Sequence, residues 1–122
     1  KLAKSISQHA SQIGKTQKIL IQINNAEEEQ KYGFSKTEVF KYFEQIQNLE
    51  SIEISGVMNM APLGIDQNDI AKLFSEIVQI RNDLEKEFNC KLQEISMGMS
   101  QDYKIAATQG STMLRVGRKL FN

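Results

Sequence analysis

The feature that most limits the fold of this chain is a regular alternation of helical and strand patterns along its 122 residues. Apolar residues at helical spacing predict helices over about 2–13, 35–49, 66–88 and 101–109. Between them, β-branched and apolar runs predict strands over 19–23, 52–58, 92–97 and 113–116. Strands separated by helices pair in parallel through right-handed crossovers, so this order predicts a parallel sheet with helices packed against it.

Local signals mark several ends of the predicted helices. Ser35 and Glu38 form the S-x-x-E capping box, in which each side chain satisfies a free backbone N–H. Asp66 or Asn68 can cap the longest helix, and Gly110 can end the shortest one in a left-handed conformation. The buried face predicted for the longest helix consists of Ile70, Leu73, Phe74, Ile77, Ile80, Leu84 and Phe88.

Four strands can form a small open sheet or half of an eight-stranded barrel, and periodicity does not choose between them. Composition narrows the class of function instead. Fifteen Lys and Arg balance fifteen Asp and Glu, which argues against a nucleic-acid or membrane-surface binder. The apolar runs are too short for a transmembrane helix. Cys90 is the single cysteine, which excludes an internal disulfide framework and leads us to expect a reducing compartment, the cytoplasm.

The last third of the chain holds the residues that favour chemistry. Gly98 and Ser100 are expected where a strand gives way to a helix, and free N–H groups with a hydroxyl there can bind an anion. Arg115 lies in an otherwise apolar strand, where a cation is unfavourable unless a carboxylate, an anion or a ligand atom meets it. Gly117 would let a ligand approach the backbone. The alternative explanation is a capped helix and an arginine in a structural ion pair.

Two sequence blocks carry a resemblance to a known family. Residues 96–102 read SMGMSQD and residues 110–117 read GSTMLRVG, which resembles the pyridoxal phosphate homeostasis protein family, also called the YggS family. Two earlier blocks, IQIN with KYGF (21–24 and 31–34) and SGVM with AP (55–58 and 61–62), resemble the same family in the same order. Its members look like the N-terminal barrel of alanine racemase.

The resemblance implies that residues 1–122 are the C-terminal half of a (β/α)8 TIM-type barrel, with four parallel strands and outer helices. The lysine that forms a Schiff base with the cofactor lies on the first strand of the family's fold, and we expect no counterpart of it here. Lys1 in place of an initiator methionine also leads us to expect a piece of a longer protein. The family's phenylalanine–glycine ending is altered, because Asn122 follows Phe121.

The family and its racemase relatives imply a role for each matching residue. Ser100 would donate to the phosphate of pyridoxal 5'-phosphate, and Gly117 with the N–H of Arg118 would complete the phosphate site. Arg118 departs from the small residue that is usual there. Arg115 would face the pyridine nitrogen and keep it unprotonated, which weakens the ring as an electron sink.

Further residues are weaker candidates. Ser96 and Met97 would line the pocket from the preceding strand, with packing as the equal alternative. Met58 would touch the cofactor ring from the end of its own strand, although a core methionine is the commoner outcome. Lys31 matches a family lysine, although a lone lysine is more often a solvated charge. His9 has no neighbouring ligand residues, so we expect no metal site.

The resemblance implies a pyridoxal phosphate-binding carrier or buffer in vitamin B6 homeostasis, without established turnover and with no catalytic residue in this chain. Cofactor binding by this chain would be non-covalent at most. The partners expected are the cofactor and, through unpaired half-barrel edges, other copies of the chain. Two alternatives remain: a pyridoxal phosphate-dependent amino-acid racemase, and a small open-sheet interaction module without a cofactor.

Overall fold

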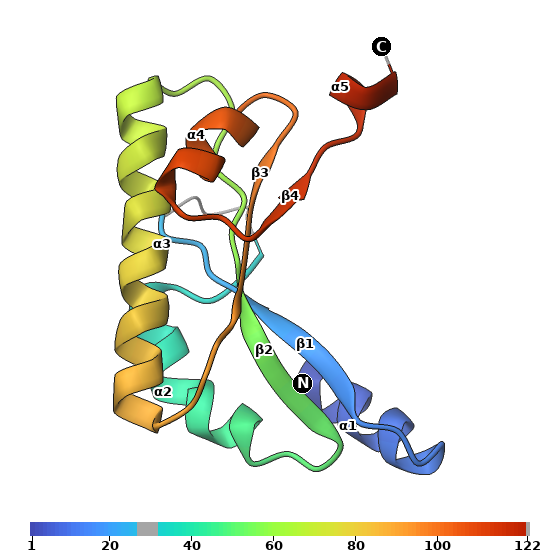
Figure 1. Cartoon of the computed structure of the whole chain (residues 1–122). Coiled ribbons are helices and arrows are strands. Elements are labelled where there is room, and N and C mark those ends of the chain that lie inside the picture. The colour runs from blue at the N-terminus through green and yellow to red at the C-terminus, as the bar shows by residue number, and fades with distance from the viewer. Residues whose placement is uncertain (27–31, 122) are drawn as a thin grey trace.

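A computed structural model describes residues 1–26 and 32–121 of the chain (Figure 1). Helices and strands alternate from α1 to β4, as the sequence predicts. The helices are α1 (Leu2–Gln12), α2 (Lys36–Gln47), α3 (Gln67–Phe88), α4 (Tyr103–Gln109) and α5 (Arg118–Phe121). The strands are β1 (Gln17–Gln22), β2 (Ile52–Met58), β3 (Glu94–Met99) and β4 (Met113–Arg115). Of these helices, none is both long enough and apolar enough to cross a membrane.

The four strands form one parallel sheet in the order β1-β2-β3-β4. Strands that are consecutive in the chain are neighbours in the sheet, so each connecting helix leads to the adjacent strand. This arrangement is the half-barrel that the resemblance implies, with half the strands of a (β/α)8 barrel. The outer strands β1 and β4 form the edges of the described sheet, and an edge strand carries main-chain groups available for further pairing.

The hydrophobic core lies between one face of the sheet and the helices α2, α3 and α4. Figure 1 shows α3 running along the length of the sheet, with α4 and α2 near its two ends. The core contains most of the residues predicted for the apolar face of α3. Its members are Ile21, Ile23, Val39, Phe43, Val57, Ile70, Phe74, Ile77, Ile80, Leu84, Leu92, Ile95, Met97 and Ala106. Burial of each large apolar side chain contributes about 1.5–3 kcal/mol.

The helix ends confirm the capping signals in the sequence. Ser35 Oγ accepts from the N–H of Glu38 at 3.2 Å, and Ser35 N–H donates to Glu38 Oε1 at 3.0 Å. Asp66, rather than Asn68, caps α3, because its carboxylate accepts from the Asn68 N–H at 3.2 Å. Gly110 ends α4 in the left-handed region with φ 106°.

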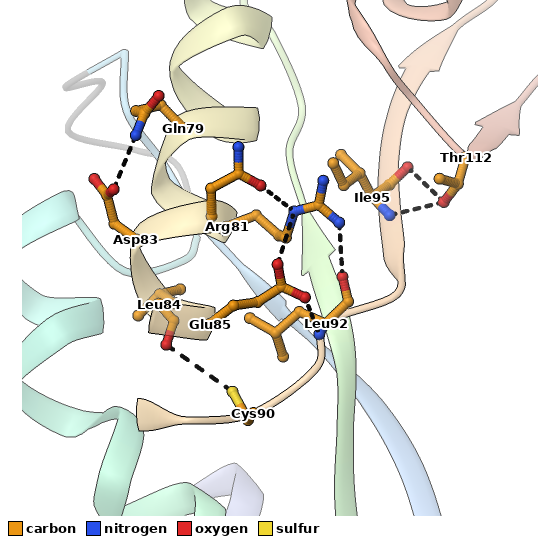
Figure 2. Close-up of polar contacts among 10 residues, drawn as sticks. Gln79, Arg81, Asp83, Leu84, Glu85, Cys90, Leu92, Ile95 and Thr112 are labelled. Atoms are coloured by element: carbon orange, nitrogen blue, oxygen red, sulfur yellow. Dashed lines mark hydrogen bonds and ion pairs between the residues drawn. The ribbon is translucent and has the colours of Figure 1, made fainter. Parts of the chain in front are cut away.

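The third strand begins at Glu94, later than the predicted start at Leu92. Figure 2 shows the cause, which is a pair of hydrogen bonds from side chains of α3 to the main chain of Leu92. The Leu92 N–H donates to Glu85 Oε2 at 2.7 Å, and its carbonyl oxygen accepts from Arg81 Nη1 at 3.0 Å. Arg81 and Glu85 also lie 3.7 Å apart as an ion pair. Because side chains occupy both main-chain groups of Leu92, strand pairing starts after it.

Other boundaries also differ from the predicted ones. The ladder of β1 ends at Gln22, and Ile23 follows as a single bridge to Phe34. Residues 118–121 form the short helix α5, which is not among the predicted helices. Lys31 lies outside the described residues.

Candidate cofactor-binding site

Arg115 is the last residue of β4 and pairs in register with Met99 of β3. Its guanidinium donates from Nη1 to Ser96 Oγ at 2.5 Å and from Nη2 to the main-chain oxygen of Asn59 at 2.8 Å. Among the described residues, these contacts use two of the five N–H donors of a guanidinium. Arg115 therefore links β3 and β4 to the residue that follows β2, and in the described part of the chain it keeps donors for a ligand.

The surroundings of this arginine are mostly neutral. Burial lowers the pKa of the Arg115 guanidinium below its usual range, and the charge of Asp102 opposes this effect. Within residues 1–26 and 32–121, no carboxylate oxygen forms an ion pair with it at 4.0 Å or less. A half-buried cation held by neutral oxygens favours an acceptor atom or an anion beside it.

Sequence reasoning missed Asn59, which directly follows β2. This residue is 2% exposed, and its Nδ2 donates to the Ile23 carbonyl at 2.9 Å and to Asn25 Oδ1 at 3.0 Å. Its main-chain N–H donates to the Ser96 carbonyl at 2.9 Å, while its own carbonyl binds Arg115. An asparagine immediately after an apolar strand was the signal that could have identified it.

The structure brings Ser100 together with the segment after β4. Ser100 Oγ accepts from the main-chain N–H of Lys119 at 3.2 Å. Gly117 and Arg118 lie just before Lys119 and are exposed. A Cβ at Gly117 would meet nothing within 4 Å, so the backbone there is open to an approaching group. The three residues predicted for the phosphate therefore lie side by side.

A turn after β3 presents Ser100. Asp102 is 4% exposed, and its Oδ1 accepts from the Met99 N–H at 2.7 Å. Its main-chain N–H donates to the Met99 carbonyl at 3.1 Å. This turn delays α4 to Tyr103, beyond the predicted start at Gln101.

The position of Gly98 differs from the prediction, because it lies within β3 rather than after it. Its φ is +105°, and a Cβ would come within 2.6 Å of Ala106 Cβ and 2.9 Å of Leu114 Cδ2. Glycine is therefore required where α4 and β4 both approach β3.

The strand residues proposed for the pocket lie on two different faces. Met58 pairs with Ser96 in register, so their side chains share one face of the sheet. Met97 is the next residue along β3, points to the opposite face and is wholly buried in the core. Packing accounts for Met97, and a binding role for it stays a prediction.

The remaining reactive side chains lie apart from Arg115. His9 is exposed on α1, with Nδ1 2.8 Å from the Ser5 carbonyl. Cys90 is a free thiol after α3, and burial, followed by the charge of Glu85, raises its pKa. In the part of the chain that the structure describes, no three His, Cys, Asp or Glu side chains gather as metal ligands.

An apolar pocket of about 620 Å³ lies between α1, β1 and α2. Its walls include Ile6, Leu20, Phe34 and Ile46. None of the predicted site residues lines it, so this pocket and the Arg115 cluster are separate features.

Comparison with known proteins assigns the family. The family model described as alanine racemase, N-terminal domain, matches residues 1–122. A pyridoxal phosphate homeostasis protein of Aquifex aeolicus is 32% identical, over 98% of this chain and 53% of that protein. One of Synechocystis sp. is also 32% identical, over 98% of this chain and 55% of that protein. The chain thus spans about half the length of these curated relatives.

Solved structures agree with this family. PipY of Synechococcus elongatus without PLP matches with a TM-score of 0.92 and 30% identity, over 99% of this chain and 57% of that one. The same protein with PLP bound gives a TM-score of 0.88 at 29% identity, over 99% of this chain and 56% of that one. Alanine racemase of Clostridium difficile, at 18% identity and TM-score 0.77 over 98% of this chain and 33% of that one, shares the fold. The chain belongs to the alanine racemase N-terminal domain family and is similar within it to the pyridoxal phosphate homeostasis proteins.

Proposed function

We propose that the protein binds pyridoxal 5'-phosphate and serves vitamin B6 homeostasis as a carrier or buffer. Arg115 is the observation that carries this proposal. It lies half-buried at the carboxyl end of a parallel sheet, where ligand sites of α/β proteins form, and its contacts leave N–H donors unused. The names of the relatives and the PLP-bound PipY structure support this choice of ligand.

The residues around Arg115 fit the ring of this ligand. An arginine is charged at any physiological pH, so it can donate to a pyridine nitrogen only while that nitrogen is unprotonated. The bound cofactor would supply an electron-accepting ring, and an unprotonated nitrogen weakens that capacity. The pairing therefore limits chemistry that needs a full carbanion. The preference for a carrier over a racemase rests on the relatives, which are named pyridoxal phosphate homeostasis proteins.

The turn at Ser100 fits the phosphate. Ser100 Oγ accepts from the Lys119 N–H, which leaves the hydroxyl proton available to donate to a phosphate oxygen. The exposed backbone at Gly117 and the N–H of Arg118 are the other proposed donors. Met58 and Ser96 share the same face of the sheet and are proposed as ring contacts.

We further propose that residues 1–122 correspond to the C-terminal half of the barrel and that the protein is cytoplasmic. The order of the four sequence blocks supports the first proposal and the free thiol of Cys90 supports the second. The edges of β1 and β4, which are unpaired in the described sheet, favour self-association of the 122-residue chain, and Met113 and Leu114 are both more than two-fifths exposed there. Sedimentation of that chain as a cooperatively folded monomer would contradict the self-association.

Titration of the protein, as its gene encodes it, with pyridoxal 5'-phosphate tests the binding. Pyridoxal, which lacks the phosphate, is the matched ligand, and Ser100→Ala is the matched variant. We expect Ser100→Ala to weaken binding of the phosphorylated ligand about tenfold, since a hydrogen bond to a charged group is lost. Pyridoxal binding should not change.

The control variant is Ser75→Ala, at an exposed position of α3, which should alter neither affinity. Absence of saturable binding in the unsubstituted protein would refute the proposed function. Racemisation of amino acids by the loaded protein would replace the carrier with a racemase.

A further inference from the structure

We propose that Asn59 is a positioning residue, which holds the Arg115 guanidinium in the orientation needed to meet the ligand. The part of this inference that concerns the ligand rests on the proposed function. Asn59 contacts Arg115 through its main-chain oxygen, and its buried side chain determines where that oxygen lies.

Backbone partners settle the orientation of the Asn59 amide. Asn25 Nδ2 donates to the Leu73 carbonyl and to Glu76 Oε1, both at 3.0 Å, so Asn25 Oδ1 is an acceptor. Asn59 Nδ2 therefore lies between two acceptors, Asn25 Oδ1 and the Ile23 carbonyl. The amide nitrogen satisfies both and cannot exchange places with the amide oxygen.

This amide also ends the pairing of β1 with β2. The Ile23 N–H donates to the Met58 carbonyl at 2.9 Å, and a parallel ladder would continue with a main-chain donor from β2 to the Ile23 carbonyl. The Asn59 side chain supplies that donor instead. The main chain is thus free to leave the sheet at Asn59, and its carbonyl oxygen receives Arg115.

The side-chain oxygen of Asn59 indicates that fold stability alone does not explain the choice of asparagine at this position. Asn59 Oδ1 is buried and has no hydrogen-bond partner among the described residues. An unpartnered buried acceptor is unfavourable, so an apolar side chain of similar size would remove this defect. An asparagine here is better explained by the position that its Nδ2 gives to the carbonyl beside Arg115.

The test is to replace Asn59 and to observe Arg115 directly. In the unliganded protein, as its gene encodes it, two fixed hydrogen bonds should slow rotation of the guanidinium, so that its Nη1 and Nη2 give separate ¹⁵N NMR signals. Asn59→Leu should merge these signals. Asn25→Ala removes one of the two acceptors of the amide and should broaden them, which keeps the test usable if Asn59→Leu folds poorly.

Thr112→Val, at the residue that precedes β4, is the matched control. Thr112 Oγ1 accepts from the Ile95 N–H and donates to Glu94, both at 2.8 Å, so its loss also removes hydrogen bonds from β3. The Arg115 signals should stay separate in this variant. Merged signals in Thr112→Val as well would overturn the inference, since Arg115 would then report general loosening of the sheet.

The cofactor gives a second, separable readout. Asn59→Leu should weaken binding of pyridoxal 5'-phosphate about fivefold, the equivalent of one neutral hydrogen bond. Separate Arg115 signals that persist in Asn59→Leu would overturn the positioning role, whatever the protein binds. Merged signals with unchanged cofactor affinity would support the positioning of Arg115 and count instead against its proposed contact with the cofactor.

Discussion

Replacing Arg115 with leucine should separate ligand binding from folding. The guanidinium donates to Ser96 Oγ and to the Asn59 carbonyl, and both acceptors lose a donor in Arg115→Leu. Removing a half-buried charge relieves its desolvation, which offsets this loss. We therefore expect the free energy of unfolding to change by about 1 kcal/mol or less.

The effect of Arg115→Leu on the cofactor should be larger. Loss of one charged hydrogen bond to the pyridine nitrogen corresponds to roughly 1.5–3 kcal/mol, or about ten- to hundredfold in affinity. Arg115→Lys keeps the charge but lacks the planar fork that spans two acceptors, so its affinity should lie between those of the wild type and Arg115→Leu.

Two measurements on the same samples decide the matter. Equilibrium titration with pyridoxal 5'-phosphate gives the affinity, and urea unfolding without ligand gives the stability. Unchanged affinity in Arg115→Leu would refute the assignment of Arg115 to the cofactor. A loss of affinity matched by an equal loss of folding free energy would show that the arginine acts through the fold.

Three further predictions concern the scaffold. Gly98→Ala should lower the free energy of unfolding in urea by at least about 2 kcal/mol, because of strain at φ +105° and contact with Ala106 and Leu114. Gly14→Ala, with open space around it, should lower it by only about 1 kcal/mol. The Ser35 contacts hold the pKa of Glu38 below its ordinary 4.5. This carboxylate therefore stabilises the fold above that pH, and stability falls as pH drops through the lowered pKa. Unfolding of Glu38→Gln across pH 3–6 should lack this pH-dependent loss of stability. Burial raises the pKa of the Cys90 thiol above 9.0, so stability should fall as pH rises through the raised value. Iodoacetamide should alkylate Cys90 near pH 9 more slowly in the native protein than in urea. Equal alkylation rates would contradict the raised pKa.

The sequence predicted the order of the elements because helices and strands repeat apolar residues at different periods, and because α2 and α3 begin at recognisable caps. The Ser35–Glu38 box and the Asp66 cap depend on residues close in the chain, which a sequence displays directly. The parallel sheet followed from the alternation itself. The half-barrel followed from the resemblance, because four strands alone permit an open sheet too.

Boundaries and partners that depend on distant residues were not predictable in this way. The start of β3 depends on Arg81 and Glu85 of the preceding helix reaching Leu92. Asn59 was missed because its partners, Ile23 and Arg115, lie far from it in sequence. Arg115 itself was identified, since a cation in an apolar strand is conspicuous, but its neutral partners could be seen only in three dimensions.

The two serines of the site have a common consequence for what it can recognise. Ser96 Oγ accepts from Arg115 and Ser100 Oγ accepts from the Lys119 N–H, so in each case a protein nitrogen already occupies an oxygen lone pair. Each hydroxyl proton then points away from that nitrogen and, together with the remaining N–H groups of Arg115, is available to donate to a ligand. The site therefore favours ligands that present hydrogen-bond acceptors at these points over ligands that present N–H or O–H groups there.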